Sequence, residues 1–308
     1  MSRIHEALKK AAQERNALRS DPSTPKLVDL SAEGLTSAVL PEDGTRPSLE
    51  QPMLGGRLSD ELQIFQEFVK KCSHPGWRIN PQFSVFSPQA SPAGAERFRT
   101  LRSRLFQIGA THPLKRVVIT SSVPEEGKTF VAANLAQSFA RQPGCRVLLI
   151  DGDLRASRLH LPFAAPETPG LSDYLNGEAD ETQITQVGAE HNLCLIPGGR
   201  SVANPSELLH SERMKLLLDR MSHLFDWILL DSPPSLAVHD ASIIADVCDG
   251  VLFVVRAGRT EFDVAERASA EFREKNLLGV VLNRVEKSES YGGYYYGYPS
   301  EKHAESSV

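Results

Sequence analysis

Short apolar runs recur along the middle of the chain, and each has the length and residue types of a buried β-strand. These runs lie at residues 117–121, 146–150, 193–197, 227–230, 250–256 and 278–284. Their continuous apolar character is typical of parallel strands that are covered on both faces. Helical patterns separate them, so the sequence predicts an α/β fold with a mostly parallel sheet and helices on both faces.

Patterns of helical period predict the remaining elements. We expect helices at residues 59–72, 93–106, 132–140, 170–175 and 204–221. A further helix is expected at 2–19, with a narrow apolar stripe. The stripe consists of Ile4, Ala7, Leu8 and Ala11. Three roles stay open for this helix: a solvated terminus, a docking helix for a partner, or a helix lying on a membrane. The stripe lacks large apolar residues, which favours docking over membrane binding.

Composition divides the chain into four segments. Residues 20–56 are rich in Pro, Ser, Asp and Gly and show no sustained period. This composition indicates disorder, so we expect a largely disordered linker at 20–80 that contains the short helix near 59–72. The expected segments are an amphipathic helix at 1–19, this linker, a globular domain at 81–287 and a flexible tail at 288–308.

The stretch after the first apolar run has the pattern of a phosphate-binding loop. Gly127-Lys128-Thr129 follows a Pro-containing turn and precedes the helix expected at 132–140. Amides at a helix N-terminus bind anions, such a lysine reaches the β- and γ-phosphates, and such a threonine hydroxyl holds Mg²⁺. Ser122 stands where the usual pattern has its first glycine, so the match is imperfect. Nucleotide contacts are expected at Ser122, Val123, Pro124, Glu125, Glu126, Gly127, Lys128, Thr129 and Phe130.

Carboxylates follow two of the apolar runs. Asp151 and Asp153 come after the second run, and Asp231 ends the fourth. The carboxyl ends of parallel strands meet at one edge of a sheet, where such folds bind ligands. A single strand-end Asp often only caps a helix, but two carboxylates one residue apart favour a site. We therefore expect Mg²⁺ to be bound by Thr129, Asp151 and Asp231.

Charge and cysteine usage exclude several classes of protein. The 308-residue chain has a formal net charge of −5, which argues against a strongly basic nucleic-acid-binding protein. Its four cysteines are scattered and never form a C-x-x-C pair. We therefore expect reduced thiols in a cytoplasmic protein, and neither a cysteine metal site nor a disulfide. No signal peptide and no apolar run of membrane-spanning length is recognised, so no membrane span is expected.

Two further clusters are candidates for function. Glu96, Arg99 and Arg102 recur every three residues in the helix expected at 93–106, where they form either an intrahelical ion pair or a contact with another subunit. The tail holds five of the six tyrosines, interleaved with glycines. They are Tyr291, Tyr294, Tyr295, Tyr296 and Tyr298. Such a tract is usually only disordered, but beside a nucleotide site a flexible run of phenols is also a candidate substrate.

Together these features resemble the bacterial tyrosine kinases, the autokinases that regulate capsule and exopolysaccharide export. The resemblance covers roughly residues 91–298, and it includes the motif Asn204-Pro205 with Leu208-Leu209. It implies a deviant P-loop ATPase fold, ATP and Mg²⁺ as cofactors, and transfer of phosphate to tyrosine. It also implies ring-like homo-oligomers in which the tail of one subunit enters the site of its neighbour.

The resemblance assigns roles to individual residues. Lys128 is expected to bind and polarise phosphates, and Asp153 to lie near the metal. Asp151 is the expected general base, because a phenol with a pKa of about 10 needs help to lose its proton at neutral pH. Asn283 stands where relatives contact the adenine. The glutamate and arginines of the 93–106 helix match the subunit-contact motif of the family, and the tail tyrosines are the expected phosphate acceptors.

Two departures from the family pattern bear on activity. The family usually has Gly where this chain has Glu125. A left-handed backbone there would cost about 1–2 kcal/mol, and a carboxylate facing a phosphate would weaken binding, whereas one pointing outward costs little. The second departure is the lack of a recognised membrane span. We therefore expect activation by a separate membrane-bound co-polymerase, which would recruit the kinase to the inner face of the plasma membrane.

Two rival functions fit the same fold. A partition or division-site ATPase would switch between monomer and dimer without kinase activity. Such ATPases carry an additional lysine near the start of the phosphate loop, and the corresponding stretch Thr120-Ser121-Ser122-Val123 has none. They also have no use for a tyrosine tail. The other rival is a catalytically weak scaffold for the polysaccharide machinery, which only Glu125 favours.

Overall fold

The structure is a computed structural model that describes residues 54–189 and 192–285, which belong to one compact unit. The helix expected at 2–19, most of the expected linker and the tyrosine tail lie outside the described residues. The strands are β1 (Arg116–Ser121), β2 (Val147–Asp151), β3 (Gln186–Val187), β4 (Leu193–Ile196), β5 (Trp227–Asp231), β6 (Gly250–Arg256) and β7 (Leu277–Asn283). Each apolar run predicted as a strand is therefore a strand.

Helices connect the strands. The α-helices are α2 (Leu54–Lys71), α3 (Pro92–Gly109), α4 (Lys128–Ala140), α5 (Leu171–Leu175), α6 (Glu181–Ile184), α7 (Pro205–Leu209), α8 (Glu212–Ser222), α9 (Asp240–Ala245) and α10 (Phe262–Ala270). Short 3₁₀ helices lie at η2 (Pro81–Phe83), η3 (Leu161–Phe163) and η4 (Arg273–Lys275). Among the described residues no helix is long and apolar enough to cross a membrane.

The seven strands form one sheet in the order β3-β4-β2-β5-β1-β6-β7. All neighbouring pairs are parallel except β3 and β4. Strand β1 pairs with β5 on one side and β6 on the other. The crossover after β1 runs to β2 on one side, and the crossover after the neighbouring strand β5 runs to β6 on the other. The carboxyl ends of β1 and β5 therefore lie at the switch point where open α/β sheets bind ligands.

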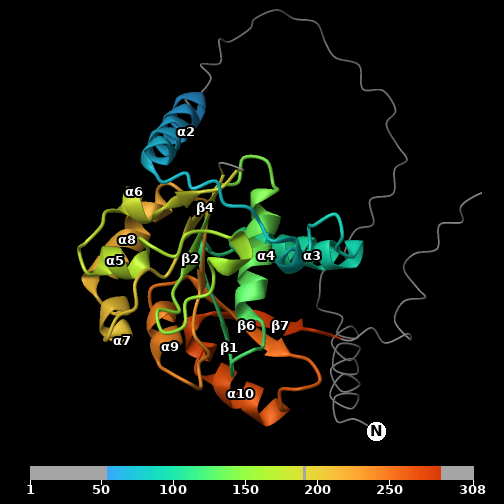
Figure 1. Cartoon of the computed structure of the whole chain (residues 1–308). Coiled ribbons are helices and arrows are strands. Elements are labelled where there is room, and N and C mark those ends of the chain that lie inside the picture. The colour runs from blue at the N-terminus through green and yellow to red at the C-terminus, as the bar shows by residue number, and fades with distance from the viewer. Residues whose placement is uncertain (1–53, 190–191, 286–308) are drawn as a thin grey trace, which may run out of the picture. The chain divides into compact units, whose positions relative to one another are not determined.

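Helices cover both faces of this sheet, as the sequence predicted (Figure 1). On one face, α4 packs directly on β1, β2 and β5, and α3 packs on the outside of α4. Each face of the sheet carries its own cluster of buried apolar side chains. Helices α8, α9 and α10 contribute to the cluster on the face opposite α4. Successive residues of a strand serve opposite faces: Leu148 and Ile150 belong to one cluster, and Val147 and Leu149 to the other.

Helix α4 is buried from Val131 to Ala140 because it lies between the sheet and α3. Its small residues, such as Ala132, Ala133 and Ala136, allow this close approach on every side. A helix buried all round holds its N-terminus firmly in place. The phosphate loop enters α4 at that N-terminus, so this packing fixes the position of the loop.

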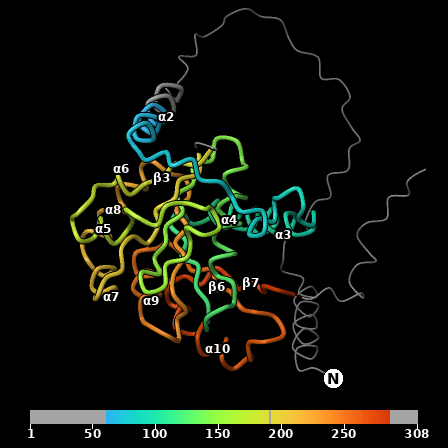
Figure 2. Tube along the Cα trace, viewed as in Figure 1, coloured from blue at the N-terminus to red at the C-terminus, as the bar shows by residue number. Residues whose placement is uncertain are grey.

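The packed part of the chain begins before residue 81, where the sequence analysis placed the start of the globular domain. Phe65 and Val69 of α2 and Trp77 beyond it are buried, and the Phe65 ring meets Phe225 edge-on at 5.4 Å between centroids. Ser73 forms a bridge to Gln186 in β3. Figure 2 shows the chain leaving α2 and crossing toward α3. Residues 61–80 are thus part of the fold.

One expected helix is divided. The segment 204–221 forms α7 and α8, separated by His210 and Ser211. The Ser211 hydroxyl donates a hydrogen bond to the Leu208 carbonyl at 2.6 Å, a local bond that competes with continuation of the helix.

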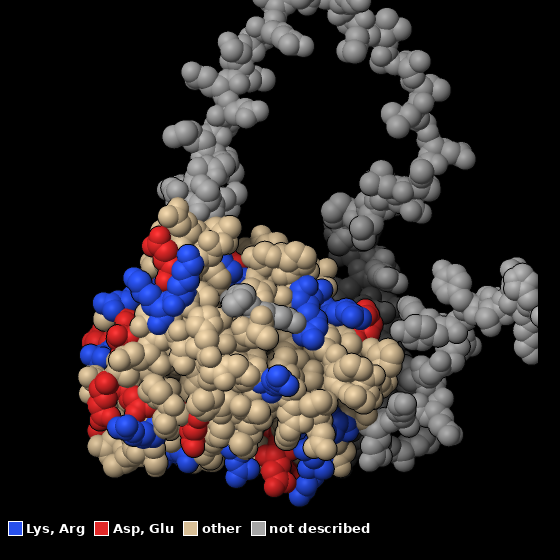
Figure 3. Space-filling model, turned by 45° about the horizontal axis from the view of Figure 1, so that its top comes forward, with Lys and Arg blue, Asp and Glu red and all other residues tan. Residues whose placement is uncertain are grey.

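On the face shown in Figure 3, basic and acidic side chains are interspersed.

The contact between Phe139 of α4 and Trp227 of β5 offers a test of the core packing. Phe139 is fully buried and stacks on Trp227 at 4.3 Å between ring centroids. We expect Phe139→Ala to lower the free energy of unfolding by about 3–5 kcal/mol, because it removes transfer energy and leaves a cavity. Phe262→Ala is the matched control: that ring is 70% exposed, and the change should stay within about 0.5 kcal/mol. Equal urea midpoints for both variants would contradict the assignment of the core.

Candidate active site

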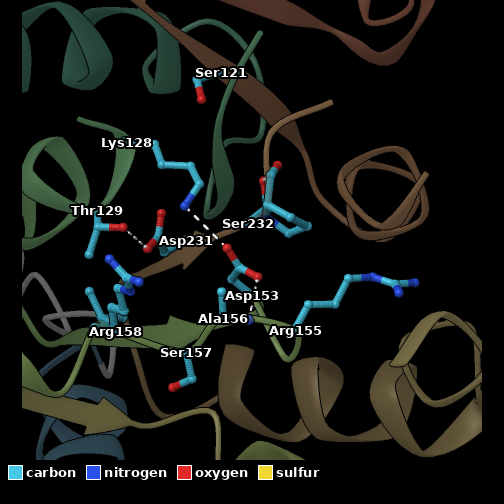
Figure 4. A network of polar contacts seen from close by, with 12 residues as sticks. Ser121, Lys128, Thr129, Asp153, Arg155, Ala156, Ser157, Arg158, Asp231 and Ser232 are labelled. Carbon is cyan, nitrogen blue, oxygen red and sulfur yellow. Dashed lines mark hydrogen bonds and ion pairs between the residues drawn. The ribbon is translucent and has the colours of Figure 1, made fainter. Parts of the chain in front are cut away.

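Three parallel strands bring the predicted site residues to one edge of the sheet. The phosphate loop follows β1, and Asp151 and Asp231 end β2 and β5. These two aspartates are register partners on adjacent strands. The Gly152 amide also donates to the Asp231 carbonyl at 2.7 Å, which continues the pairing past the strand ends. Figure 4 shows Lys128, Thr129, Asp153 and Asp231 converging at this edge.

The phosphate loop depends on a glycine at its last turn. Gly127 has a φ of +93°, in the left-handed region, and it precedes the first residue of α4. A Cβ at this position would overlap the side-chain amide of Asn283, which donates to the Glu126 carbonyl at 2.8 Å. Only glycine satisfies both constraints. The contact also places Asn283, at the end of β7, against the phosphate loop.

Glu125 has the left-handed backbone conformation whose cost the sequence analysis considered. Its φ is +67°, at a backbone cost of about 1–2 kcal/mol. The carboxylate is 76% exposed and lies 3.9 Å from the Arg259 guanidinium. It therefore points outward into solvent, the orientation for which the electrostatic cost is small.

The side chain of Glu126 turns into the protein and supports the phosphate loop. The residue is 1% exposed. Its carboxylate accepts hydrogen bonds from the Val123 amide at 2.8 Å, the Thr260 hydroxyl at 2.6 Å and the Arg256 amide at 3.3 Å. The side chain thus ties the phosphate loop to the segment between β6 and α10. Thr260 was not anticipated, since it lies 134 residues away in the sequence.

Lys128 lies among carboxylates. Its ammonium is 3.2 Å from Asp153 Oδ2. Burial alone would lower the pKa of Lys128, but the negative charges of Asp231, Asp153 and Asp151 together raise it above its usual value. The lysine is therefore charged throughout the physiological range and is available to neutralise a phosphate.

Thr129 and Asp231 form the part of the site that fits a magnesium ion. The Thr129 hydroxyl donates to Asp231 Oδ2 at 2.6 Å, while Oδ1 is buried and has no partner among the described residues. An orphaned carboxylate oxygen beside a hydroxyl is a suitable start for a Mg²⁺ site, which one or two carboxylates complete with phosphates and water. Within the described ranges no three His, Cys, Asp or Glu side chains cluster as metal ligands.

Burial sets the charge state of Asp231. It raises the pKa of this carboxyl to about 7, against the opposing charge of Lys128, and the nearby Asp151 adds to the rise. A neutral Asp231 relieves the repulsion between carboxylates when no cation is bound. A divalent ion would favour the charged form and release the proton.

Asp151 is enclosed more completely than the sequence suggested. One oxygen accepts from the Asp153 amide at 3.0 Å. The other accepts from the Ser157 hydroxyl at 2.8 Å and from the amides of Arg158 and Leu159 at 3.2 and 3.0 Å. Burial raises the pKa of Asp151 to about 6 despite these bonds. Oδ2 accepts three bonds and Oδ1 only one, so Oδ1 is the oxygen of Asp151 that retains capacity for a further partner. The expectation that Asp151 binds Mg²⁺ stays a prediction.

Comparison with known proteins identifies the domain. Residues 117–301 match the CobQ/CobB/MinD/ParA nucleotide binding domain family. The tyrosine-protein kinase YwqD of Bacillus subtilis (strain 168) is 38% identical over 66% of this chain and 86% of its own length. This chain belongs to the bacterial tyrosine kinases. It therefore carries a nucleotide-binding domain and is a protein-tyrosine kinase, as the motifs predicted.

Solved structures agree with this assignment. The chimerical protein CapA2B2 superimposes with a TM-score of 0.63 at 29% identity, over 74% of this kinase and the whole of that chain. The kinase domain of the Escherichia coli tyrosine kinase ETK gives a TM-score of 0.59 at 31% identity, over 70% of this kinase and 83% of that chain. The mostly parallel sheet covered by helices is thus the fold of this family.

The predicted subunit-contact residues of the kinase lie on α3 and face two different directions. Glu96 and Arg99 pair with each other at 2.9 Å and are about half exposed. Arg102 instead donates to the Ser138 carbonyl of α4 at 2.6 Å. Two of the three side chains are thus presented to solvent, and the third holds α3 on α4. The acceptor tyrosines predicted at 291–298 lie outside the described residues.

The buried carboxyl of Asp231 predicts a pH-dependent stability for the kinase without nucleotide or metal. Its pKa is about 3.8 in the unfolded chain and about 7 in the fold, so the fold binds the proton more tightly. The free energy of unfolding should therefore fall as pH rises from about 4 to about 7. Asp231→Asn should reduce the fall between pH 5 and pH 8 by about 1–3 kcal/mol.

Urea titrations at the two pH values measure this difference. Asp219→Asn, which removes a carboxylate that is 65% exposed, serves as the control and should leave the pH dependence unchanged. An Asp231→Asn variant with the full wild-type dependence would show that another group is responsible.

Proposed function

We propose that this kinase is an ATP-dependent autokinase that phosphorylates its own C-terminal tyrosine cluster between subunits. The observation that carries the proposal is the convergence of Lys128, Thr129 and Asp231 beside the phosphate loop, on a chain that carries five tyrosines between residues 291 and 298. Glycines interleave those tyrosines, which favours a tail that adapts to a neighbouring site.

The proposed reaction uses the side chains in distinct roles. The phosphate-loop amides and Lys128 hold the β- and γ-phosphates. To bind them, Lys128 gives up its ion pair with Asp153. Thr129 and Asp231 would hold Mg²⁺, which neutralises charge on the phosphates. The tyrosine oxygen forms its bond to the γ-phosphorus while the bond from that phosphorus to the ADP oxygen breaks. The phenol proton passes to a carboxylate.

Asp151 is the proposed acceptor of that proton, as the family resemblance implies. Each of its oxygens is hydrogen-bonded in the present conformation. Oδ1 accepts only the bond from the Asp153 amide, so it is the oxygen that would take the proton. Because Asp151 is completely buried, the proposal requires that the turn around it opens when the phenol enters. Active-site hydrogen bonds commonly rearrange on substrate binding, and a carboxyl whose pKa is about 6 is a suitable base near neutral pH.

Several wider features belong to the same proposal. Asn283, at the phosphate loop, would contact the adenine. Glu96 and Arg99 would contact a neighbouring subunit in a homo-oligomer, which one repeated contact would close as a ring. A separate membrane-bound co-polymerase would activate the kinase and recruit it to the inner face of the plasma membrane, where it would regulate capsule or exopolysaccharide export. The formal net charge of −5 argues against a nucleic-acid partner.

Mixing two variants tests transfer between subunits. Lys128→Ala with an intact tail is incubated with Mg-ATP and an active chain that lacks residues 288–308. We expect phosphotyrosine on the Lys128→Ala tail in the mixture. Alone, this variant should lose activity at least about 100-fold, because it lacks the cation that stabilises the transferring phosphate.

Lys215→Ala is the matched control, since Lys215 pairs with Glu212 on the surface of α8; it should retain wild-type phosphorylation. A Lys128→Ala tail that stays unmodified in the mixture would refute transfer between chains. Undiminished phosphorylation of folded Lys128→Ala alone would refute the role of the lysine.

A further inference from the structure

A further buried carboxylate lies next to the site and takes no part in the proposed chemistry. Asp240, the first residue of α9, is completely buried. The Arg155 guanidinium donates to both of its oxygens, from Nε at 2.7 Å and from Nη2 at 3.2 Å. The Ser206 hydroxyl of α7 donates to the same carboxylate at 2.6 Å and accepts from Arg155 Nη2 at 2.8 Å. Three separate segments thus meet in one closed hydrogen-bond network.

This network constrains the backbone more tightly than an ordinary ion pair does. A buried carboxylate without partners is strongly unfavourable, so Asp240 needs the guanidinium where it is. A planar guanidinium that binds through two nitrogens has one preferred orientation relative to the carboxylate. The position of Arg155 is therefore set by α7 and α9.

Arg155 belongs to the same short turn as a predicted catalytic carboxylate. Asp153 lies two residues earlier, and its Oδ1 accepts from the amide of Ala156, the residue after Arg155, at 3.1 Å. Its Oδ2 pairs with Lys128. In Figure 4 the Arg155 side chain extends away from Lys128 and Asp153. Arg155 thus anchors the turn from outside while Asp153 projects into the site.

The network also accounts for the motif Asn204-Pro205 with Leu208-Leu209, to which the proposed reaction assigns no role. Pro205 and Leu209 of α7 are buried, and Leu208 packs against the core cluster on that face of the sheet. These contacts fix α7 against the domain and direct the Ser206 hydroxyl toward Asp240. The motif therefore helps to position the active-site edge, although none of its side chains takes part in the proposed reaction.

We propose that Asp240 and Ser206 are positioning residues, which act through Arg155 to hold Asp153 in register with Lys128 during phosphoryl transfer. The proposal rests on the proposed autokinase function. It predicts an effect on the chemical step more than on nucleotide binding, because the phosphate-loop amides that bind the nucleotide are outside the network. A displacement of a catalytic group by about 1 Å costs up to about 100-fold in rate.

The first test compares two aspartates of one helix. Asp240→Asn keeps the shape and removes the charge. Asp246→Asn is the control, because Asp246 caps the other end of α9 and pairs with Lys275 at 2.7 Å on the surface. We expect Asp240→Asn to lower kcat for tail phosphorylation about 10- to 100-fold, with the Kd for Mg-ADP changed less than about threefold. Asp246→Asn should change neither.

The second test separates positioning from stability. Asp240 is completely buried, whereas the Arg155 side chain is 40% exposed. Replacing both residues by apolar ones leaves no buried charge without a partner, so the double variant Arg155→Met with Asp240→Leu should melt close to wild type yet remain slow. Recovery of wild-type kcat in that variant, or an unchanged kcat in Asp240→Asn, would overturn the proposal. Ser206→Ala, which leaves both Arg155 bonds to Asp240, should show a smaller loss. An inactive wild type would refute the proposed function instead.

Discussion

The parallel pairing of β2 with β5 is the constraint on which the site depends, because it places two buried carboxylates side by side. Asp151 and Asp231 are register partners, and Asp153 stands two residues beyond. Like charges at such a site repel each other strongly in a medium of low dielectric constant. The structure offsets this repulsion with Lys128, and burial together with the neighbouring carboxylates raises the pKa values of the two strand-end aspartates. An edge of the sheet built in this way has a strong preference for additional cations.

The three aspartates at this edge have different hydrogen-bond partners and therefore different roles. Asp151 accepts hydrogen bonds from backbone amides and from Ser157, so it organises the turn after β2. Asp153 pairs with Lys128 and fixes the position of its ammonium group. Asp231 keeps one oxygen without a partner among the described residues, and it is the carboxylate best suited to a metal. The same residue type therefore serves three purposes, according to the hydrogen bonds available at each position.

The strands, the phosphate loop and the strand-end aspartates could be predicted because their signals are local. An apolar run that ends in Asp, or a Gly-Lys-Thr at a helix start, needs no knowledge of distant residues. The inward turn of Glu126 toward Thr260 and the contact of Arg102 with Ser138 could not be predicted. These choices depend on which segments the fold brings together. The packing of Phe65 onto Phe225 was missed for the same reason, since its short helix follows a stretch with the composition of a linker.

The central claim is that the edge of the sheet between β2 and β5 transfers phosphate from Mg-ATP to tyrosines of this chain. Mass-spectrometric mapping of the purified kinase after incubation with Mg-ATP tests it most directly. We expect phosphotyrosine confined to the cluster at 291–298, at a rate that falls sharply in Asp231→Asn. A folded, nucleotide-bound protein that acquires no phosphate on these tyrosines would contradict the claim, as would an Asp231→Asn variant that is as active as wild type.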